Sequence, residues 1–254
     1  MRNTKKIFIP MLFALFLASL GHGALLPQST VESTPNTLSP GESLSYTIQY
    51  YGIPGGTADI QIDSGPSHLQ DTLVFRADIK TNFAISAFWR IEDTFMTLVK
   101  KNGFRTIMTR LWEDENGKKQ YREEKYKNNA IKVQETHDDK TKKFSVKSPG
   151  NTVDGLSAIW LLRSKPLNIG DEEQFNLFAN RKIFQTHAKV EGIEAIELDG
   201  ERKETIRVNP VLHHNGKRVK DTKVKVWYTN DDRRVPVRIE SKNKYGKLKF
   251  VLND

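Results

Sequence analysis

Apolar and polar residues alternate along most of the chain after residue 42, and this period of two is typical of strands that bury one face. In one such run Leu73, Phe75, Ala77 and Ile79 share a face, and residues such as Arg76 fall on the other. The pattern returns as far as residue 252. It predicts roughly a dozen strands, at the spacing expected of a sandwich or barrel.

Good turn formers separate many of the predicted strands. Asn-Gly pairs stand at residues 102–103, 116–117 and 215–216, and Asn128-Asn129 and Asp138-Asp139 mark two further breaks. Asn and Gly tolerate the positive φ angles of two-residue hairpin turns, so an Asn-Gly pair is a specific hairpin signal. The middle of the chain is therefore predicted to be an antiparallel meander.

One segment breaks the alternation and has the spacing of a helix. Asp154 can cap its first turn, and Pro166 stops it. Apolar side chains fall on nearly every side of this helix, so it must be buried. We therefore predict a mainly β protein: an antiparallel, strongly curved sheet or an incompletely closed β-barrel with one short buried helix at about 154–163. No linker signal follows residue 41, so residues 42–254 are expected to form a single β domain.

The first 23 residues have the three parts of a secretory signal peptide. Arg2, Lys5 and Lys6 form a basic start, residues 7–20 are mostly apolar, and small glycines follow at 21 and 23. A transmembrane anchor is the rival interpretation, but it needs about 20 apolar residues. This run is shorter and contains Pro10. We expect cleavage after residue 23, a flexible leader over residues 24–41, and a soluble protein in the periplasm.

The composition narrows the set of partners. There is no cysteine, which excludes a disulfide framework and a thiol nucleophile. Loss of the three basic residues of the signal peptide would lower the formal net charge from +9 to +6. That charge indicates either solubility or attraction to anionic envelope polymers. Basic residues are interleaved with acids, as in residues 122–125 (REEK), so nucleic acid is not expected as a partner.

Candidate catalytic and metal-binding groups are sparse. His213 and His214 are adjacent, and neighbours on a strand point to opposite faces, so they would hold one metal badly. Acidic residues stand together at 92–93, 114–115, 138–139, 171–173 and 231–232, and we interpret them as solvated residues of turns. The sequence contains neither a serine nucleophile elbow nor a glycine-rich phosphate loop. It thus predicts no catalytic residue, no metal and no cofactor.

Three tryptophans, Trp89, Trp160 and Trp227, lie in apolar stretches and are the most informative candidates for a binding site. Packing in the core is the simplest role for such side chains. The alternative is that they line an apolar cavity inside the curved sheet, with the helix as a plug or lid. Arg163 would then lie near the rim of the cavity and could meet an anionic head group. We take Trp160, Arg163 and Trp227 as the candidate ligand-binding residues.

Four segments of the chain resemble a known bacterial family. They are residues 40–46 (PGESLSY), 51–58 (YGIPGGTA), 154–163 (DGLSAIWLLR) and 226–239 (VWYTNDDRRVPVRI). In this order they resemble the exported proteins catalogued as domain of unknown function (DUF) 3108, over about residues 40–252. The resemblance implies a periplasmic or outer-membrane-facing location in Gram-negative bacteria, no established reaction and no catalytic residues. In its many strands and single helix the chain is also similar to periplasmic lipoprotein carriers and β-spiral envelope-integrity proteins.

These observations favour a non-enzymatic periplasmic protein that supports cell-envelope integrity by binding a lipidic envelope component or a partner protein. An envelope glycan is a further ligand class. One alternative is a structural or scaffold module with a filled core that acts only through its surface. Another is an enzyme on envelope glycans, which would need two carboxylates facing each other across a cleft. The interior of the fold, cavity or packed core, decides between these functions.

Overall fold

The computed structural model describes residues 38–198, 200–243 and 246–253. The predicted signal peptide (1–23) and most of the predicted leader (24–41) lie outside these residues. The end of the leader is described: Leu38 packs against the main core, and the amide of Gly41 donates to the carbonyl of Ile62 at 2.7 Å. The first strand begins at Glu42, where alternation begins in the sequence.

The first half of the protein is an antiparallel meander in which each strand pairs with the next. Its strands are β1 (Glu42–Tyr50), β2 (Ile53–Ser64), β3 (Thr72–Thr81), β4 (Ile91–Lys100), β5 (Arg105–Glu115), β6 (Lys118–Tyr126), β7 (Ala130–His137) and β8 (Lys140–Lys147). Between β5 and β6, Asn116 and Gly117 have φ angles of 51° and 78°, as the Asn-Gly signal predicts.

The second half continues the same sheet, because the last strand pairs with β1. Its strands are β9 (Thr152–Val153), β10 (Glu172–Ala179), β11 (Lys182–Leu198), β12 (Glu201–His214), β13 (Lys217–Arg218), β14 (Lys223–Thr229), β15 (Pro236–Asn243) and β16 (Gly246–Leu252). β9 pairs with β10 in parallel, whereas the other pairs are antiparallel. Two predicted strands, 183–190 and 193–198, are one strand, β11, with a bulge between Val190 and Gly192.

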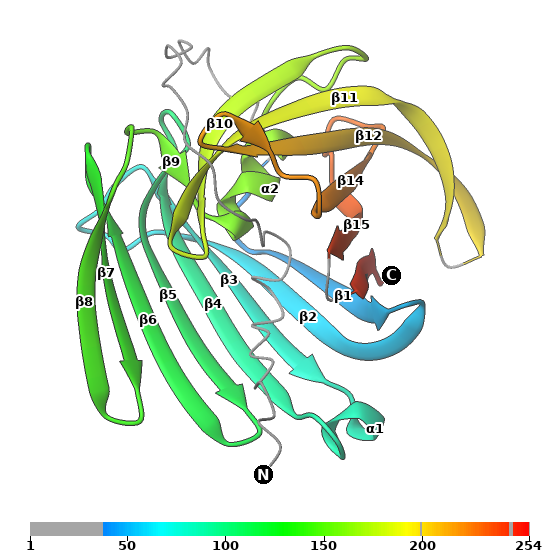
Figure 1. Cartoon of the computed structure of the whole chain (residues 1–254). Coiled ribbons are helices and arrows are strands. Elements are labelled where there is room, and N and C mark those ends of the chain that lie inside the picture. The colour runs from blue at the N-terminus through cyan, green and yellow to red at the C-terminus, as the bar shows by residue number, and fades with distance from the viewer. Residues whose placement is uncertain (1–37, 199, 244–245, 254) are drawn as a thin grey trace.

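In the described residues all sixteen strands belong to one sheet, which curls without closing and has β8 and β9 at its edges. Figure 1 shows the β1–β8 half facing the strands that follow α2. Side chains bridge the gap between the halves: Phe178 of β10 packs with Ile131 and Val133 of β7, and Arg181 forms an ion pair with Glu135 of β7. The predicted curved, incompletely closed β-barrel is therefore confirmed.

The predicted helix is present as α2 (Gly155–Arg163) and lies inside the curve of the sheet (Figure 1). α2 and the buried face of the sheet share one continuous apolar core. Tyr46 of β1, Phe75 of β3 and Tyr228 of β14 belong to it. The Tyr228 hydroxyl also donates to the carbonyl of Ile159 at 2.9 Å, which ties the helix to the far side of the sheet.

The sequence does not predict the second helix, α1 (Phe83–Ser86), because four residues carry no helical periodicity. Asn82 caps it by accepting the amide of Ile85 at 2.9 Å. Trp89 follows α1 and is 42% exposed, so it does not pack in the core, which is the simplest role predicted for it. Neither helix in the described part of the chain has the length and apolar character of a membrane span.

Candidate functional site

Asp154 joins the start of α2 to β4 and β5. Its Oδ1 accepts the amides of Leu156 and Ser157 at 2.9 and 3.0 Å, which is the predicted N-cap. Its Oδ2 accepts the hydroxyls of Thr97 at 2.8 Å, Thr106 at 2.9 Å and Ser157. These five donors satisfy a carboxylate that is 1% exposed, so Asp154 fixes the helix and offers no reactive group.

Arg163 ends α2 and is 1% exposed, whereas the sequence predicts it near the rim of a cavity. Its guanidinium donates two hydrogen bonds to the carboxylate of Glu42 at 2.8 and 2.9 Å. Its Nε donates to the carbonyl of Arg233 at 2.8 Å. A bidentate pair of this kind is strong and geometrically specific. An anionic head group would therefore have to displace Glu42 to reach Arg163.

Trp160 lies in the main core and is 0% exposed. Its ring stacks on Phe75, with the centroids 5.7 Å apart and the planes at 4°, and the Arg163 guanidinium carbon lies 5.3 Å from its centroid. Among the described residues, its indole N–H meets no acceptor. A buried donor left unpaired costs about 1–3 kcal/mol. Trp160 thus lies in a packed core, and its indole nitrogen is a buried donor without an acceptor among the described residues.

Trp227 does not lie with Trp160. It packs in a second cluster, apart from the main core, with Ile196, Leu198 and Val237. Its indole N–H donates to the carboxylate of Glu194 at 3.1 Å. The structure therefore brings Trp160 and Arg163 together on α2 and places Trp227 elsewhere.

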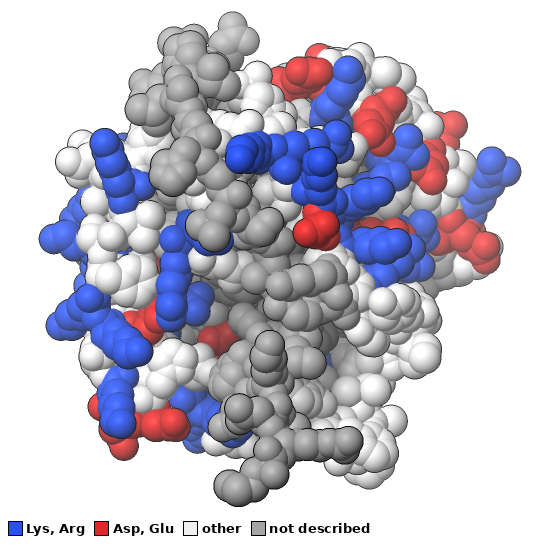
Figure 2. All heavy atoms as spheres, viewed as in Figure 1, with Lys and Arg blue, Asp and Glu red and all other residues white. Residues whose placement is uncertain are grey.

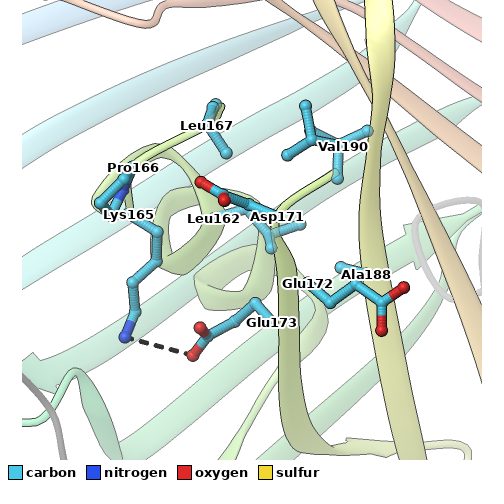
Figure 3. Close-up of a pocket in the computed structure, with 10 residues that line it drawn as sticks. Leu162, Lys165, Pro166, Leu167, Asp171, Glu172, Glu173, Ala188 and Val190 are labelled. Carbon is cyan, nitrogen blue, oxygen red and sulfur yellow. Dashed lines mark ion pairs between the residues drawn. The ribbon is translucent and has the colours of Figure 1, made fainter. Parts of the chain in front are cut away.

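A pocket of about 160 Å³ opens between the end of α2, the segment after it and strands β10 to β12 (Figure 3). Its buried lining is apolar: Leu162, Leu167, Ala188, Val190 and Val208. Its more exposed lining carries charge: Lys165, Asp171, Glu172 and Glu173. The Lys165 ammonium lies 3.2 Å from the Glu173 carboxylate. The pocket thus combines an apolar wall with a charged mouth.

The three candidate residues, Trp160, Arg163 and Trp227, are not among those that line this pocket. Its lining comes from α2, from residues 165–173 and from the two strands that follow β10 in the chain, β11 and β12. One local feature of the sequence points to this pocket: Leu167 is an apolar residue directly after Pro166. The structure buries Leu167. Sequence reasoning missed the pocket because strand alternation does not tell which strands curl over the helix.

Three buried carboxylates lie side by side on one face of β4 and β5, and we refer to Asp93, Glu113 and Glu115 as the acid cluster. Asp93 opposes Glu113 in the strand ladder, and Glu115 follows two residues later on the same face. Their oxygens approach within 4.8 Å of one another. The interpretation of residues 92–93 and 114–115 as solvated turn acids is therefore wrong for Asp93 and Glu115, which lie buried in strands.

Burial raises the pKa of all three carboxyl groups in the acid cluster. The pKa of Asp93 rises to about 7, through burial and then through Glu113 and Glu115. Burial and Glu113 raise the pKa of Glu115 to about 7 as well. Burial also raises the pKa of Glu113, against the opposing charge of Arg122. The cluster therefore keeps part of its protons at neutral pH.

The acid cluster could hold a cation more readily than cleave a glycan. Its carboxylate oxygens are a donor set that a hard cation such as Ca²⁺ accepts. Because the carboxylates are neighbours on one sheet face, they do not flank a substrate as the two carboxylates of a glycosidase do.

Positive and negative side chains are interspersed on the face shown in Figure 2, in keeping with the interleaved charges of the sequence. On the β11–β12 hairpin, Arg207 pairs with Glu191 at 2.8 Å and with Glu194 at 2.5 Å. On the β5–β6 hairpin, Arg110 pairs with Glu123 at 2.9 Å. Exposed pairs of this kind contribute little stability.

The geometry defines a class of protein: an open, β-barrel-like sheet with one helix held inside its curve. The crystal structure of a β-barrel-like protein of domain of unknown function DUF1849 from Brucella abortus is similar, with a TM-score of 0.55 and 12% identity over 84% of this chain and 95% of that chain. At this identity the likeness shows the fold alone. The chain belongs to the family described as protein of unknown function (DUF3108), whose model matches residues 45–253. The resemblance stated from the sequence is thereby confirmed.

Two further comparisons add nothing to the functional argument. The Mycobacterium tuberculosis lipoprotein LppX aligns over 83% of this chain and 84% of that chain at 11% identity, but the TM-score of 0.24 is too low to support an inference. No curated protein matches the chain. The function must therefore be argued from the residues of the site.

Proposed function

We propose that this protein is a non-enzymatic component of the bacterial periplasm that supports the cell envelope by binding a lipidic component in the pocket beside α2. The observation that carries the proposal is the lining of that pocket, where buried apolar side chains stand next to a basic one, Lys165. Ligand sites of proteins combine apolar walls with a few polar groups that orient the ligand. An amphipathic molecule fits such a lining.

The volume of the pocket limits what it can hold. A dry apolar cavity of about 150 Å³ accommodates benzene, and this pocket measures about 160 Å³. It therefore fits the end of an acyl chain, with the rest of the ligand extending past the charged mouth. Lys165 is the one basic side chain beside three acids at the mouth, so an anionic head group can bind only where it replaces Glu173 next to Lys165. Lys165 and Glu173 are 18% and 28% exposed, and a partly exposed pair of this kind is weak enough for that exchange.

Filling the pocket tests the proposal. Ala188 is 2% exposed and lines the pocket, so Ala188→Phe places a ring where the apolar group would lie. The protein recovered after export is expected to bind a fluorescent fatty-acid analogue, and Ala188→Phe to weaken this binding about tenfold or more, as loss of 1.4 kcal/mol would. Ala195→Phe is the matched control, because Ala195 is exposed on the same strand and should leave the affinity unchanged.

A second variant keeps the test valid if Ala188→Phe fails to fold. Lys165→Gln removes the one positive charge of the partly exposed mouth without adding volume. It should weaken binding of the anionic fatty-acid analogue and leave binding of the matching neutral alcohol unchanged. One result would contradict a ligand in this pocket. It is equal binding of both probes by all four proteins: wild type, Lys165→Gln, Ala195→Phe and Ala188→Phe.

The proposed location and envelope role rest on the sequence. The signal-peptide pattern of residues 1–23 supports export, and the resemblance to exported DUF3108 proteins supports the periplasm. A strain that lacks the gene should be more sensitive to detergents and cell-wall antibiotics than its parent. Unchanged sensitivity would contradict the envelope role, and a cytoplasmic location on fractionation would contradict export.

The packed surroundings of Trp160 favour a second function, a scaffold that acts only through its surface. Trp160 stacks on Phe75 in the main core, so side chains fill that part of the curve. On this account the exported protein binds no fatty-acid analogue, and crosslinking in the envelope recovers a partner protein. The probe-binding experiment separates the two functions.

A further inference from the structure

Large apolar side chains are exposed at the end of the sheet where β1 turns into β2 and β3 leads into α1 (Figure 1). Phe83 is 95% exposed and Phe88 is 87% exposed, which is nearly the full surface of each ring. We define the aromatic rim as these two residues with four neighbours that are 36–67% exposed: Tyr51, Ile53, Ile85 and Trp89. Contiguous exposed apolar patches mark interaction sites.

Hydrogen bonds hold the two turns of the aromatic rim together. Asn82, the cap of α1, donates its side-chain amide to the carbonyl of Pro54 at 2.9 Å and its backbone amide to the carbonyl of Gly55 at 2.9 Å. The amides of Phe88 and Trp89 both donate to the carbonyl of Ile85, at 2.9 and 2.8 Å. The two turns are therefore held in place relative to each other.

Tyr51 occupies a backbone position that disfavours it. Tyr51 and Gly52 have φ angles of 51° and 87°, the two positive angles of a hairpin turn that prefers Asn-Gly. A bulky residue with a positive φ is strained. Tyr51 is 65% exposed and its ring packs edge-to-face on that of Tyr50, with the centroids 4.8 Å apart, so burial offsets little of that strain. Strained residues concentrate at functional sites, and an exposed aromatic side chain at this turn serves binding better than folding.

We propose that the aromatic rim docks the protein on the surface of a lipid bilayer. Aromatic side chains favour the boundary between head groups and hydrocarbon, where one end of the ring system is wet and the other apolar. The most exposed rings, Phe83 and Phe88, project from turns, as suits shallow insertion into lipid. Two exposed lysines after the β5–β6 turn at the same end, Lys118 and Lys119, suit anionic head groups. The β7–β8 turn beyond it is electrically mixed, with Asp138 and Asp139 beside Lys140.

This docking surface does not depend on the pocket beside α2, because the two share no residue. The experiments therefore separate them. Variants of the rim should leave binding of the fatty-acid analogue unchanged, and Ala188→Phe should leave membrane binding unchanged.

The test is flotation of the exported protein with vesicles of phosphatidylethanolamine and phosphatidylglycerol. The double variant Phe83→Ser, Phe88→Ser should lower the partition coefficient about a hundredfold or more, because it removes both of the rings that would be buried in lipid. The matched control is Ile169→Ser with Ile193→Ser, at residues that are 66% and 51% exposed outside the rim. The control should bind as wild type does.

Tyr51→Asn separates docking from folding. It should weaken vesicle binding and at the same time raise the thermal unfolding midpoint, whereas a structural tyrosine would lower the midpoint. Absence of vesicle binding by the wild-type protein, or equal binding by the Phe83→Ser, Phe88→Ser variant, would overturn the proposal. So would a photo-crosslinker at Phe88 that captures an envelope protein and no lipid.

Discussion

Replacing Asp93 with asparagine tests the account of the acid cluster. An aspartate in an unfolded chain has a pKa of about 3.9, whereas burial and the adjacent carboxylates raise the pKa of Asp93 to about 7 in the folded protein. Between these values the folded state holds more protons than the unfolded state, so stability falls as the pH rises through this window. For one such group the linkage relation gives a loss of about 2–3 kcal/mol between pH 5 and pH 8.

The measurement is urea unfolding at about pH 5 and about pH 8, followed by tryptophan fluorescence. The wild-type protein should be less stable at the higher pH, and Asp93→Asn should reduce the difference by about 2–3 kcal/mol, the share of that one group. Glu115, whose pKa is raised by burial and by Glu113, keeps its own share of the difference. Asp139→Asn is the matched control, since Asp139 is exposed in the β7–β8 turn and should keep the wild-type difference. A wild-type protein that is equally stable at both pH values, or an Asp93→Asn protein with the wild-type difference, would refute the reasoning.

Two further predictions concern packing and ion pairing. Glu42→Gln should lower the free energy of unfolding by about 3 kcal/mol, because Arg163 stays charged and buried after losing its carboxylate partner. A urea midpoint close to wild type would contradict this. Gly56→Ala should cost about 2–3 kcal/mol, because its Cβ would lie 2.3 Å from the carbonyl oxygen of Lys80. Gly55→Ala is the control, because its Cβ would meet no atom closer than 3.8 Å, and it should unfold like wild type. Equal urea midpoints for the two alanine variants would contradict the predicted clash at Gly56.

Local patterns predicted the elements of the fold because the pleat of a strand fixes which side chains share a face. Leu73, Phe75, Ala77 and Ile79 are all buried, as their spacing indicates. The helix followed from its cap and its apolar surface. The single strand β11 was predicted as two, because Gly192 has the character of a chain break in the sequence but forms a bulge that preserves the pairing.

The candidate site was less predictable because it depends on contacts between distant segments. Arg163 has the pattern of an exposed residue at a helix end, but Glu42, 121 residues earlier in the chain, pairs with it and accounts for its burial. Asp93 lies in a strand whose alternation is plain, yet alternation does not say that its face is enclosed. Trp160 and Trp227 share an apolar local sequence and nevertheless pack in separate clusters. The curvature of the sheet, which no local pattern encodes, decides these outcomes.

Native mass spectrometry of the protein purified from the periplasm without detergent tests the central claim most directly. We expect a population with added mass that organic extraction removes and identifies as lipid, and we expect this population to be lost in Ala188→Phe and kept in Ala195→Phe. A spectrum in which the wild-type protein carries only the mass of the polypeptide would contradict a lipidic ligand beside α2.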